Sequence, residues 1–371
     1  MAVEESDRIG RRITDARHRV GLTQAQLAAA ISIDRSALAK IESGSRRVTA
    51  LELSRIADTL GERIEWFIKE APAAIVSHRN LQDPGAVSPQ IDRLVEHLAR
   101  NVEFTVGHDD KLRLESRQLP RPDSAAAAEL AAQEARKLIG LNTGEPCAGL
   151  SIRASEIGLL PFSIDLGPEA ADAASLLLRT GGVALVNGNL RVGRRRLALA
   201  HELGHYLFAD EYTVDWRVAE RDGDEAWESR LDRFARALLL PPQGLKAAWS
   251  AANAKANLRA AAVKIGSWYQ VDMSTLARRL LELDLVSPSN AHDIRAVRTT
   301  KADIVEFNLV VAEELTPPHL AKRYVESVLR LYRSTTISAA RAMDLLVDTW
   351  CEDDLPALDP LPESAIWKFV S

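Results

Sequence analysis

The stretch RRRLALAHELGHYLFAD, residues 194–210, places two histidines four residues apart within a run of strong helix formers. On a helix, positions i and i+4 lie one turn apart on one face, so His201 and His205 can bind one metal ion, and the pattern favours zinc. Glu202 would lie to one side, where its carboxylate can take a proton from attacking water without binding the metal. The motif alone also fits an amphipathic helix that carries two solvated or hydrogen-bonded histidines.

A second predicted helix, EAWESRLDRFARALLLPP at residues 225–242, supplies a candidate third ligand. Its apolar side chains recur at helical spacing, and Glu228 lies in its first half. Two histidines and a glutamate would leave one coordination position open, as in catalytic zinc sites. Asp232, one turn further on, can replace Glu228 as a ligand or accept a hydrogen bond from a ligand histidine.

Residues 9–67 predict five short helices. Thr23, Asp34 and Thr49 are candidate N-caps, and glycines such as Gly21 and Gly44 follow the predicted helix ends. Two short capped helices joined by a tight turn form a helix-turn-helix.

This segment resembles the XRE family of helix-turn-helix domains, the type found in phage repressors, on the motifs LTQAQLA, SALAKIESG and ALEL. The resemblance implies that residues 34–42 enter the major groove of an operator in double-stranded DNA. The base-edge candidates are Arg35, Ser36 and Lys40, and the phosphate candidates are Gln24, Arg46 and Arg47. XRE-type domains bind paired half-sites, so we expect a homodimer.

Two residues of this segment concern its own fold and not its contacts with DNA. Glu42 is expected to bond within the domain, and Ser32 stands where the family usually has glycine in the turn. The alternative is that this segment has kept the helix-turn-helix fold but binds another protein and no longer binds DNA.

The middle of the chain predicts a mixture of helices and strands. A long helix runs from an N-cap at Ser124 to Gly140, and PFSIDL and GGVALVNGNL, residues 161–166 and 181–190, read as hairpin-forming strands. A strand beside the helix that carries His201 and His205 would have a free edge, and an extended substrate could pair with that edge. The basic run at residues 194–196 fits either an anion contact or a solvated helix start.

Three separated motifs, GVALVNG, RRRLALAHELGHYLF and ExxLDRFARALLLP, are similar to the ImmA/IrrE family of metallopeptidases over roughly residues 125–285. The resemblance implies a zinc endopeptidase in which His201, His205 and Glu228 hold the metal and Glu202 is the general base. It also implies a repressor, antitoxin or other regulatory protein as substrate, within toxin–antitoxin or stress-response regulation.

The expected fold is mainly α with a small β-sheet, in the α+β class. We expect a helix-turn-helix bundle at 1–70, a linker and bracing helix at 71–123, a zincin-like peptidase domain at 124–290, and a C-terminal helical extension with an acidic tail at 291–371. Within this scheme, residues 68–88 form the linker. In the last third, Ser274 and Ser338 are the expected N-caps of two helices.

The compartment follows from what the sequence lacks. The N-terminus has no apolar segment of a secretory signal, no apolar run is long enough to span a membrane, and Cys147 and Cys351 form no metal-binding pair. We therefore expect a cytoplasmic protein without a membrane partner.

Together these features predict a DNA-binding regulator with zinc-dependent endopeptidase activity. The competing hypothesis is a non-catalytic transcriptional repressor or antitoxin, in which the peptidase-like domain serves as a sensor or binds a partner. Glu202 favours catalysis, because a purely structural metal site would not need it.

Overall fold

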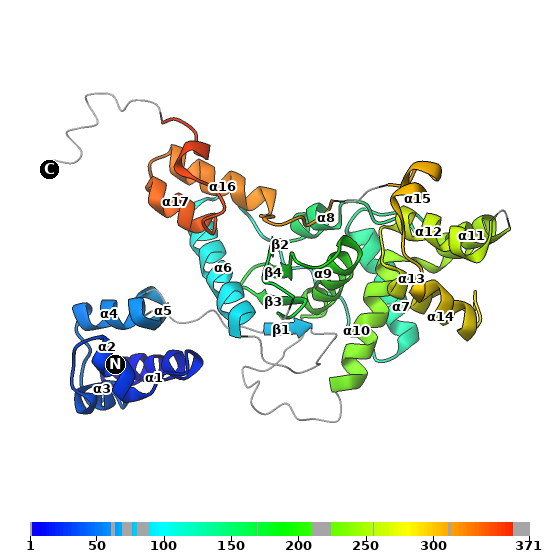
Figure 1. Ribbon diagram of the computed structural model, residues 1–371. Helices are drawn as coiled ribbons and strands as arrows, with labels where there is room; N and C mark the ends of the chain where they lie inside the picture. The colour runs from blue at the N-terminus through cyan, green and yellow to red at the C-terminus, as the bar shows by residue number, and fades with distance from the viewer. Residues whose placement is uncertain are drawn as a thin grey trace. The chain divides into compact units, whose positions relative to one another are not determined.

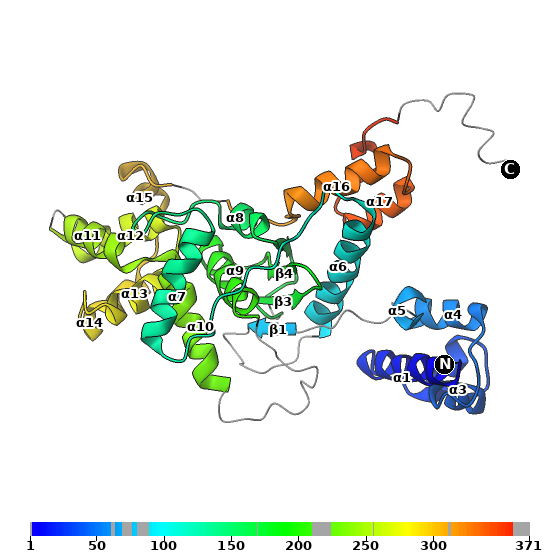
Figure 2. The same cartoon turned by 180° about the vertical axis from the view of Figure 1, so that it is seen from behind.

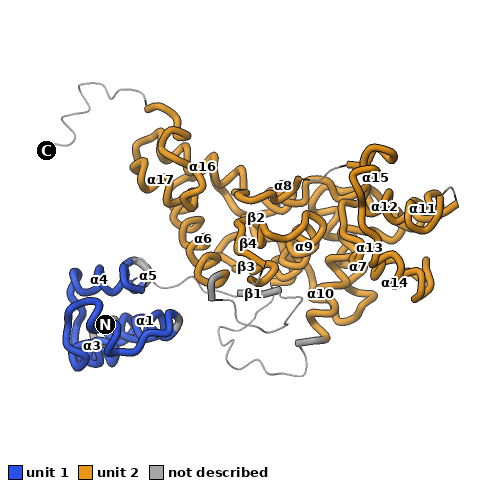
Figure 3. Tube along the Cα trace, in the orientation of Figure 1, with its two compact units in different colours: residues 1–72 blue, residues 73–371 orange. Residues whose placement is uncertain are grey.

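A computed structural model describes residues 2–60, 64–68, 76–79, 89–168, 170–209, 224–254, 256–310 and 313–358. The chain divides into two compact units, residues 1–72 and 73–371 (Figure 3).

In its described residues, unit 1 is a bundle of five helices around one apolar core. They are α1 Ala2–Arg19, α2 Gln24–Ala30, α3 Arg35–Glu42, α4 Ala50–Leu60 and α5 Ile64–Ile68. The core is built from residues such as Ile13, Leu27, Leu38, Ile56 and Phe67. The turn between α2 and α3 places Ser32 at φ 58°, the left-handed conformation that glycine adopts most readily. This backbone geometry explains why related domains have glycine at that position.

A buried ion pair fixes α3 against α1. Arg17 Nε and Nη2 donate to the Glu42 carboxylate at 2.6 and 3.0 Å, which confirms that Glu42 bonds within the domain. A β-carbon on Gly10 would lie 2.4 Å from the carbonyl oxygen of Ile41, so only glycine permits this approach of the two helices. The opposite surface of α3, which carries Arg35, Ser36 and Lys40, is exposed to solvent.

The described part of unit 2 is organised around a four-stranded sheet with the strand order β1-β3-β4-β2. The strands are β1 Val76–Arg79, β2 Leu159–Ile164, β3 Ala173–Leu177 and β4 Gly182–Asn187. β3 is antiparallel to both β1 and β4, whereas β2 is parallel to β4. A turn joins β3 to β4, with Gly181 at φ 79° and Leu178 N donating to the Gly181 carbonyl.

The predicted hairpin between residues 161–166 and 181–190 is therefore wrong. These segments contain β2 and β4, which are parallel neighbours, and the hairpin partner of β4 is β3. The predicted linker at 68–88 lies mostly outside the described residues, but its segment Val76–Arg79 forms β1.

Helices lie on both sides of the sheet (Figures 1 and 2). Each face of the sheet contributes to its own apolar core. Along β4, Ala184 and Val186 pack into the core that contains α9, Val192–Leu207. Val183 and Leu185 pack into the opposite core, with α6 Pro89–His108, α16 Lys322–Arg333 and α17 Ala339–Leu345. The alternation of a strand thus places the metal-motif helix on one face and α6, α16 and α17 on the other.

Two of the remaining helices, α8 Leu150–Glu156 and α10 Asp224–Leu239, pack directly against α9. α7 Ala125–Leu138 packs against α10, and the 3₁₀ helix η1 Glu352–Asp354 contacts α17. The other helices are α11 Pro242–Asn253, α12 Leu258–Tyr269, α13 Met273–Glu282, α14 Pro288–Ala296 and α15 Lys301–Glu306. Ser124 and Ser338 cap α7 and α17 as predicted. Ser274 is not the cap of α13, because Asp272 holds that position and accepts from the Thr275 amide.

The predicted α+β class, mainly helical with a small sheet, is confirmed. Among the described residues, none of the helices has the length and apolar character needed to cross a membrane.

Candidate active site and nucleic-acid interface

The two motif histidines lie on α9, which is buried along almost its whole length. Their side chains come from successive turns of this helix, and the two Nε2 atoms lie 3.2 Å apart. Both imidazoles therefore direct the same ring nitrogen toward one point. His201 and His205 are only 2% and 5% exposed, so that point is shielded from bulk water on the side of the helix.

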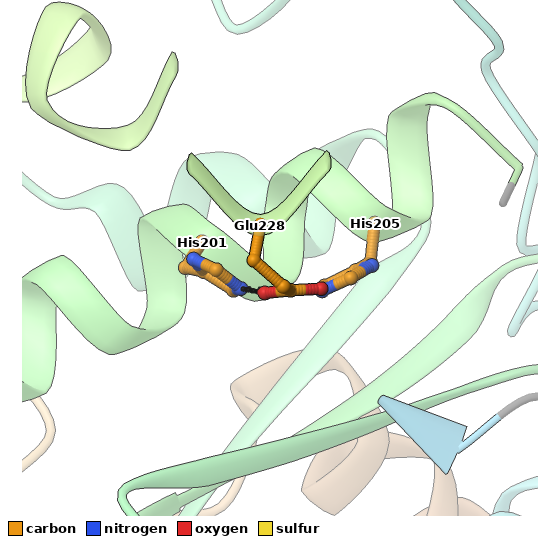
Figure 4. Close-up of side chains that lie close together, drawn as sticks. All are labelled: His201, His205 and Glu228. Atoms are coloured by element: carbon orange, nitrogen blue, oxygen red, sulfur yellow. Dashed lines mark hydrogen bonds and ion pairs between the residues drawn. The ribbon is translucent and has the colours of Figure 1, made fainter. Parts of the chain in front are cut away.

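Glu228 reaches the same point from α10. Its Oε2 lies 3.1 Å from His201 Nε2, and its Oε1 lies 3.8 Å from His205 Nε2. Figure 4 shows the carboxylate between the two imidazoles. One ligand atom from each of these three residues lies within 4.8 Å of the others, and this is the arrangement that the sequence predicts.

The spacing of these atoms fits a zinc ion. Zinc–ligand bonds of about 2.0–2.2 Å at tetrahedral angles put neighbouring ligand atoms roughly 3.3 Å apart. The separations of 3.2 Å between the two Nε2 atoms and 3.1 Å between His201 Nε2 and Glu228 Oε2 are close to this value, and Glu228 Oε1 lies farther from His205 Nε2, at 3.8 Å. The side chain of Glu228 is 40% exposed, so solvent reaches this candidate ligand.

Asp232 contacts the other nitrogen of His201. Its Oδ1 lies 3.1 Å from His201 Nδ1, and its Oδ2 lies 3.6 Å from Arg236 Nη1. A carboxylate at Nδ1 favours the proton on that nitrogen, so that Nε2 carries the lone pair that can bind a metal. Of the two alternatives that the sequence left open, the geometry places Asp232 behind the ligand histidine.

A glycine lets the two ligand-bearing helices approach each other. A β-carbon on Gly204 would lie 2.9 Å from Leu231 Cδ2 and 3.1 Å from Phe234 Cδ1, both on α10. Leu231 and Phe234 are fully buried, so they have little room to move away. The glycine of the H-E-L-G-H sequence therefore sets the distance at which Glu228 meets the histidines.

The carboxylate of Glu202 lies on the sheet side of α9 and is fully buried. Ser175 Oγ on β3 donates to Glu202 Oε2 at 2.5 Å. The other oxygen, Oε1, is buried and has no hydrogen-bond partner among the described residues. A buried carboxylate oxygen without a partner is costly, and a bound water would satisfy it. Ser175 is the site residue that the sequence analysis missed.

The two histidines affect the pKa of the third candidate ligand. Burial raises the pKa of the Glu228 carboxyl, but its hydrogen bond with His201 and its electrostatic interactions with His201 and His205 outweigh that effect. The net result is a pKa below the ordinary value, which favours the ionised form that binds metals.

The three arginines at the start of α9, residues 194–196, form ion pairs and hydrogen bonds within the protein. Arg194 forms two hydrogen bonds with the Asp172 carboxylate, at 2.8 and 2.7 Å. Arg195 donates to the carbonyls of Gly188 and Leu190. Arg196 is fully buried and pairs with Glu314 and the Cys147 carbonyl. Neither an anion contact nor a solvated helix start describes this run.

Some of the candidate DNA-binding side chains are exposed, and others form hydrogen bonds within unit 1. Arg35, Ser36 and Lys40 are exposed on α3, and Arg47 is exposed in the loop after it. Two of the phosphate candidates bond within the unit. Gln24 Nε2 donates to Glu42 at 2.7 Å, and Arg46 Nη2 donates to Glu52 at 2.7 Å.

The expected free strand edge beside α9 is not free. β3 contacts α9, but the edge of β3 that faces away from β4 pairs with β1. Ser77 pairs with Ser175 and His78 with Ala174 in this register.

Two separate segments of the chain match known protein families. Residues 13–67 match the helix-turn-helix family, and residues 154–281 match the family described as IrrE N-terminal-like domain. No curated protein matches the chain. Among solved structures, a Mycobacterium tuberculosis transcriptional regulator aligns with 18% identity and a TM-score of 0.29, over 50% of this chain and 51% of that one. The chain thus spans about half the length of that regulator in the alignment.

These two matches coincide in position with the two resemblances found in the sequence. The chain joins an XRE-type helix-turn-helix domain to an ImmA/IrrE-like domain of the M78 peptidase family.

Proposed function

We propose that this protein is a DNA-binding regulator whose second unit is a zinc-dependent endopeptidase, and that its substrate is a repressor, an antitoxin or another regulatory protein. The observation that carries the proposal is the convergence of His201, His205 and Glu228, whose ligand atoms lie within 4.8 Å of one another. Such a donor set of two imidazoles and one carboxylate suits a catalytic zinc site.

In this proposal, zinc held by the three residues supplies a Lewis acid that polarises the scissile carbonyl. Glu202 takes the proton of the attacking water on Oε1, the oxygen that Ser175 leaves unbonded. Glu202 then passes the proton to the leaving amine. Asp232 holds the imidazole of His201 in the orientation that presents Nε2 to the metal.

The DNA-binding half supports a regulatory protein as substrate. Exposed Arg35, Ser36 and Lys40 on α3 are proposed to contact base edges in the major groove, and Gln24, Arg46 and Arg47 to contact phosphates. A chain that is bound to an operator raises the local concentration of its peptidase near other DNA-bound regulators. We also propose a homodimer on paired half-sites, as helix-turn-helix domains commonly form.

The decisive experiment compares the wild-type protein with Glu202→Gln. Glutamine keeps the size of the side chain but cannot accept the proton, so zinc content should be retained. Removal of a general base lowers rates by ~10²–10⁴-fold. Each protein encoded by a gene adjacent to this one is co-expressed with either form, and its half-life in cells is measured, with and without DNA damage.

His205→Ala is the matched comparison, since it should lose both zinc and proteolysis while DNA binding persists. Equal substrate half-lives with wild type and Glu202→Gln, for every neighbouring protein tested under both conditions, would replace the peptidase with the non-catalytic repressor or antitoxin.

A further inference from the structure

Without β1, the outer edge of β3 would be an open backbone edge beside the candidate active site, which an incoming peptide could extend. β3 lies next to α9, and its Ser175 holds the carboxylate of Glu202. A peptide that adds to a strand edge gains its main-chain hydrogen bonds regardless of sequence, which suits an enzyme that binds extended substrates.

This edge is taken by a segment of the same chain. Val76–Arg79 form β1 and pair along β3 from Leu176 to Ala173. β1 is the end strand of the sheet, and it also contacts α9, the metal-motif helix. One edge of a strand can form a ladder with only one other strand at a time.

The register places β1 directly at the candidate site. Ser77 lies opposite Ser175, the residue that hydrogen-bonds Glu202. The backbone of β1 therefore passes the strand position that supports the proposed general base. Any substrate strand that reaches this position must use the same hydrogen-bonding groups of β3.

We propose that β1 is an internal competitor that occupies the substrate-binding edge of β3 and has to leave before a protein substrate can bind. This inference rests on the proposed peptidase function, since it concerns the regulation of the same site. The competitor belongs to the stretch of chain between α5 of unit 1 and α6 of unit 2.

A tethered competitor of this size is suited to regulation. Attachment through a short connection gives an effective concentration of about millimolar, well above that of a protein substrate in solution. Yet a strand of four residues forms few ladder hydrogen bonds, so a longer substrate strand can displace it.

The test uses the full-length chain carrying Glu202→Gln, so that bound peptide is not cut. Ser77→Pro with His78→Pro removes both backbone amides, and whichever of them donates to β3 is lost. Ser77→Ala with His78→Ala is the control, since it keeps both amides. The probe is a fluorescent peptide with the sequence of residues 73–82, AAIVSHRNLQ, and its binding is followed by fluorescence anisotropy.

We expect the double-proline variant to bind the probe at least tenfold more tightly than the parent and the alanine control. An edge that is occupied nine-tenths of the time weakens apparent affinity about tenfold. Hydrogen–deuterium exchange at β3 amides should also be faster in the double-proline variant and should slow again when the probe is added. Equal probe affinity and equal exchange in all three proteins would overturn the proposal.

The same probe separates this inference from the peptidase function. With Glu202 restored and zinc supplied, cleavage of the probe by the double-proline variant supports both proposals. Tighter binding without cleavage supports the competitor and counts against the peptidase.

Discussion

Ser175 on an inner strand of the sheet donates a 2.5 Å hydrogen bond to Glu202 on α9. The bond fixes one carboxylate oxygen and leaves the other for water. If Glu202 is the general base, as we propose, Ser175 is its positioning residue, and the sheet would take part in catalysis through this hydrogen bond.

We expect Ser175→Ala to lower kcat by about 10- to 100-fold, because a hydrogen bond to a charged group contributes about 1.5–3 kcal/mol. Zinc content should not change, since Ser175 contacts no proposed ligand. Ser163→Ala on β2 is the control, because that buried hydroxyl has no hydrogen-bond partner within the described residues. A normal kcat in Ser175→Ala would remove the positioning role.

Asp232→Asn should weaken zinc binding by about 10- to 100-fold, the usual cost of losing a carboxylate behind a ligand histidine. The amide cannot hold His201 Nδ1–H as a carboxylate does. Zinc affinity is measured by competition with a chromogenic chelator. Asp293→Asn, an exposed position on α14, serves as the comparison and should bind zinc normally. Equal affinities would show that Asp232 does not support the site.

Gly204→Ala should destabilise the protein by about 1–3 kcal/mol, because the added methyl group overpacks the contact of α9 with Leu231 and Phe234. Zinc affinity should fall as well, since Glu228 moves away with α10. Gly107→Ala on α6 is matched to it, because nothing lies within 4 Å of the added carbon. That variant should be unchanged or slightly more stable. Denaturant unfolding with and without zinc measures both effects.

Arg35→Ala should cost about 1–3 kcal/mol of discrimination at one base pair, whereas Arg47→Ala should weaken binding to all sequences alike and reduce the salt slope by about 1. Arg46→Ala should change the slope less than Arg47→Ala, because Arg46 already pairs with Glu52. The measurement is binding to a selected operator and to random DNA over a series of salt concentrations. If all three variants behave like the parent on both DNAs, α3 and its following loop do not contact DNA in this way.

Asp109 should make the stability of unit 2 depend on pH in the acid range. Burial raises the pKa of this carboxyl, but hydrogen bonds from Arg330 and Ser327 outweigh it and hold the pKa below its usual value. Because the folded pKa is the lower one, this stabilisation is present above the unfolded pKa of about 3.9 and is lost as pH falls through the folded value.

Asp109→Asn should therefore lower the free energy of unfolding at pH 7 by about 1–3 kcal/mol and flatten its decline below pH 4. Unfolding curves of both proteins from pH 7 to pH 3 provide the measurement. A constant difference between the two proteins over that whole range would contradict this account.

Local chemistry in the sequence predicted much of the helical structure. The cap at Thr23 forms between residues three apart, so the residue types alone reveal it. The cap of α13 was misplaced because Asp272 and Ser274 are both good capping residues, and only the packing around the helix selects Asp272.

The sheet was harder to predict, because strand pairing joins distant segments. β3 has the short sequence AASLL, which shows neither strong alternation nor many β-branched residues. Without β3, the segments that form β2 and β4 resembled a hairpin. β1 lies within a stretch rich in proline and polar residues, and its strand conformation depends on pairing with β3.

The sequence predicted the candidate metal ligands, but it did not predict Ser175, which hydrogen-bonds the proposed general base. His201 and His205 are related by helical spacing, and a family motif marks Glu228. Ser175 meets Glu202 across 27 residues of sequence, from a strand that carries no signal of its own. A contact of this kind depends on the packed fold.

The sheet with a core on each face has a consequence for the way in which the chain is made. α6 emerges early during synthesis, but its partners α16 and α17 follow much later, and Asp109 meets Ser327 across 218 residues. At about 5–20 residues per second, the ribosome makes these partners roughly ten to forty seconds after α6, so the apolar side of α6 that packs against α16 stays uncovered during that time. The half that contains the metal-motif helix is complete first, so a nascent chain stalled before residue 320 would expose an apolar surface to chaperones.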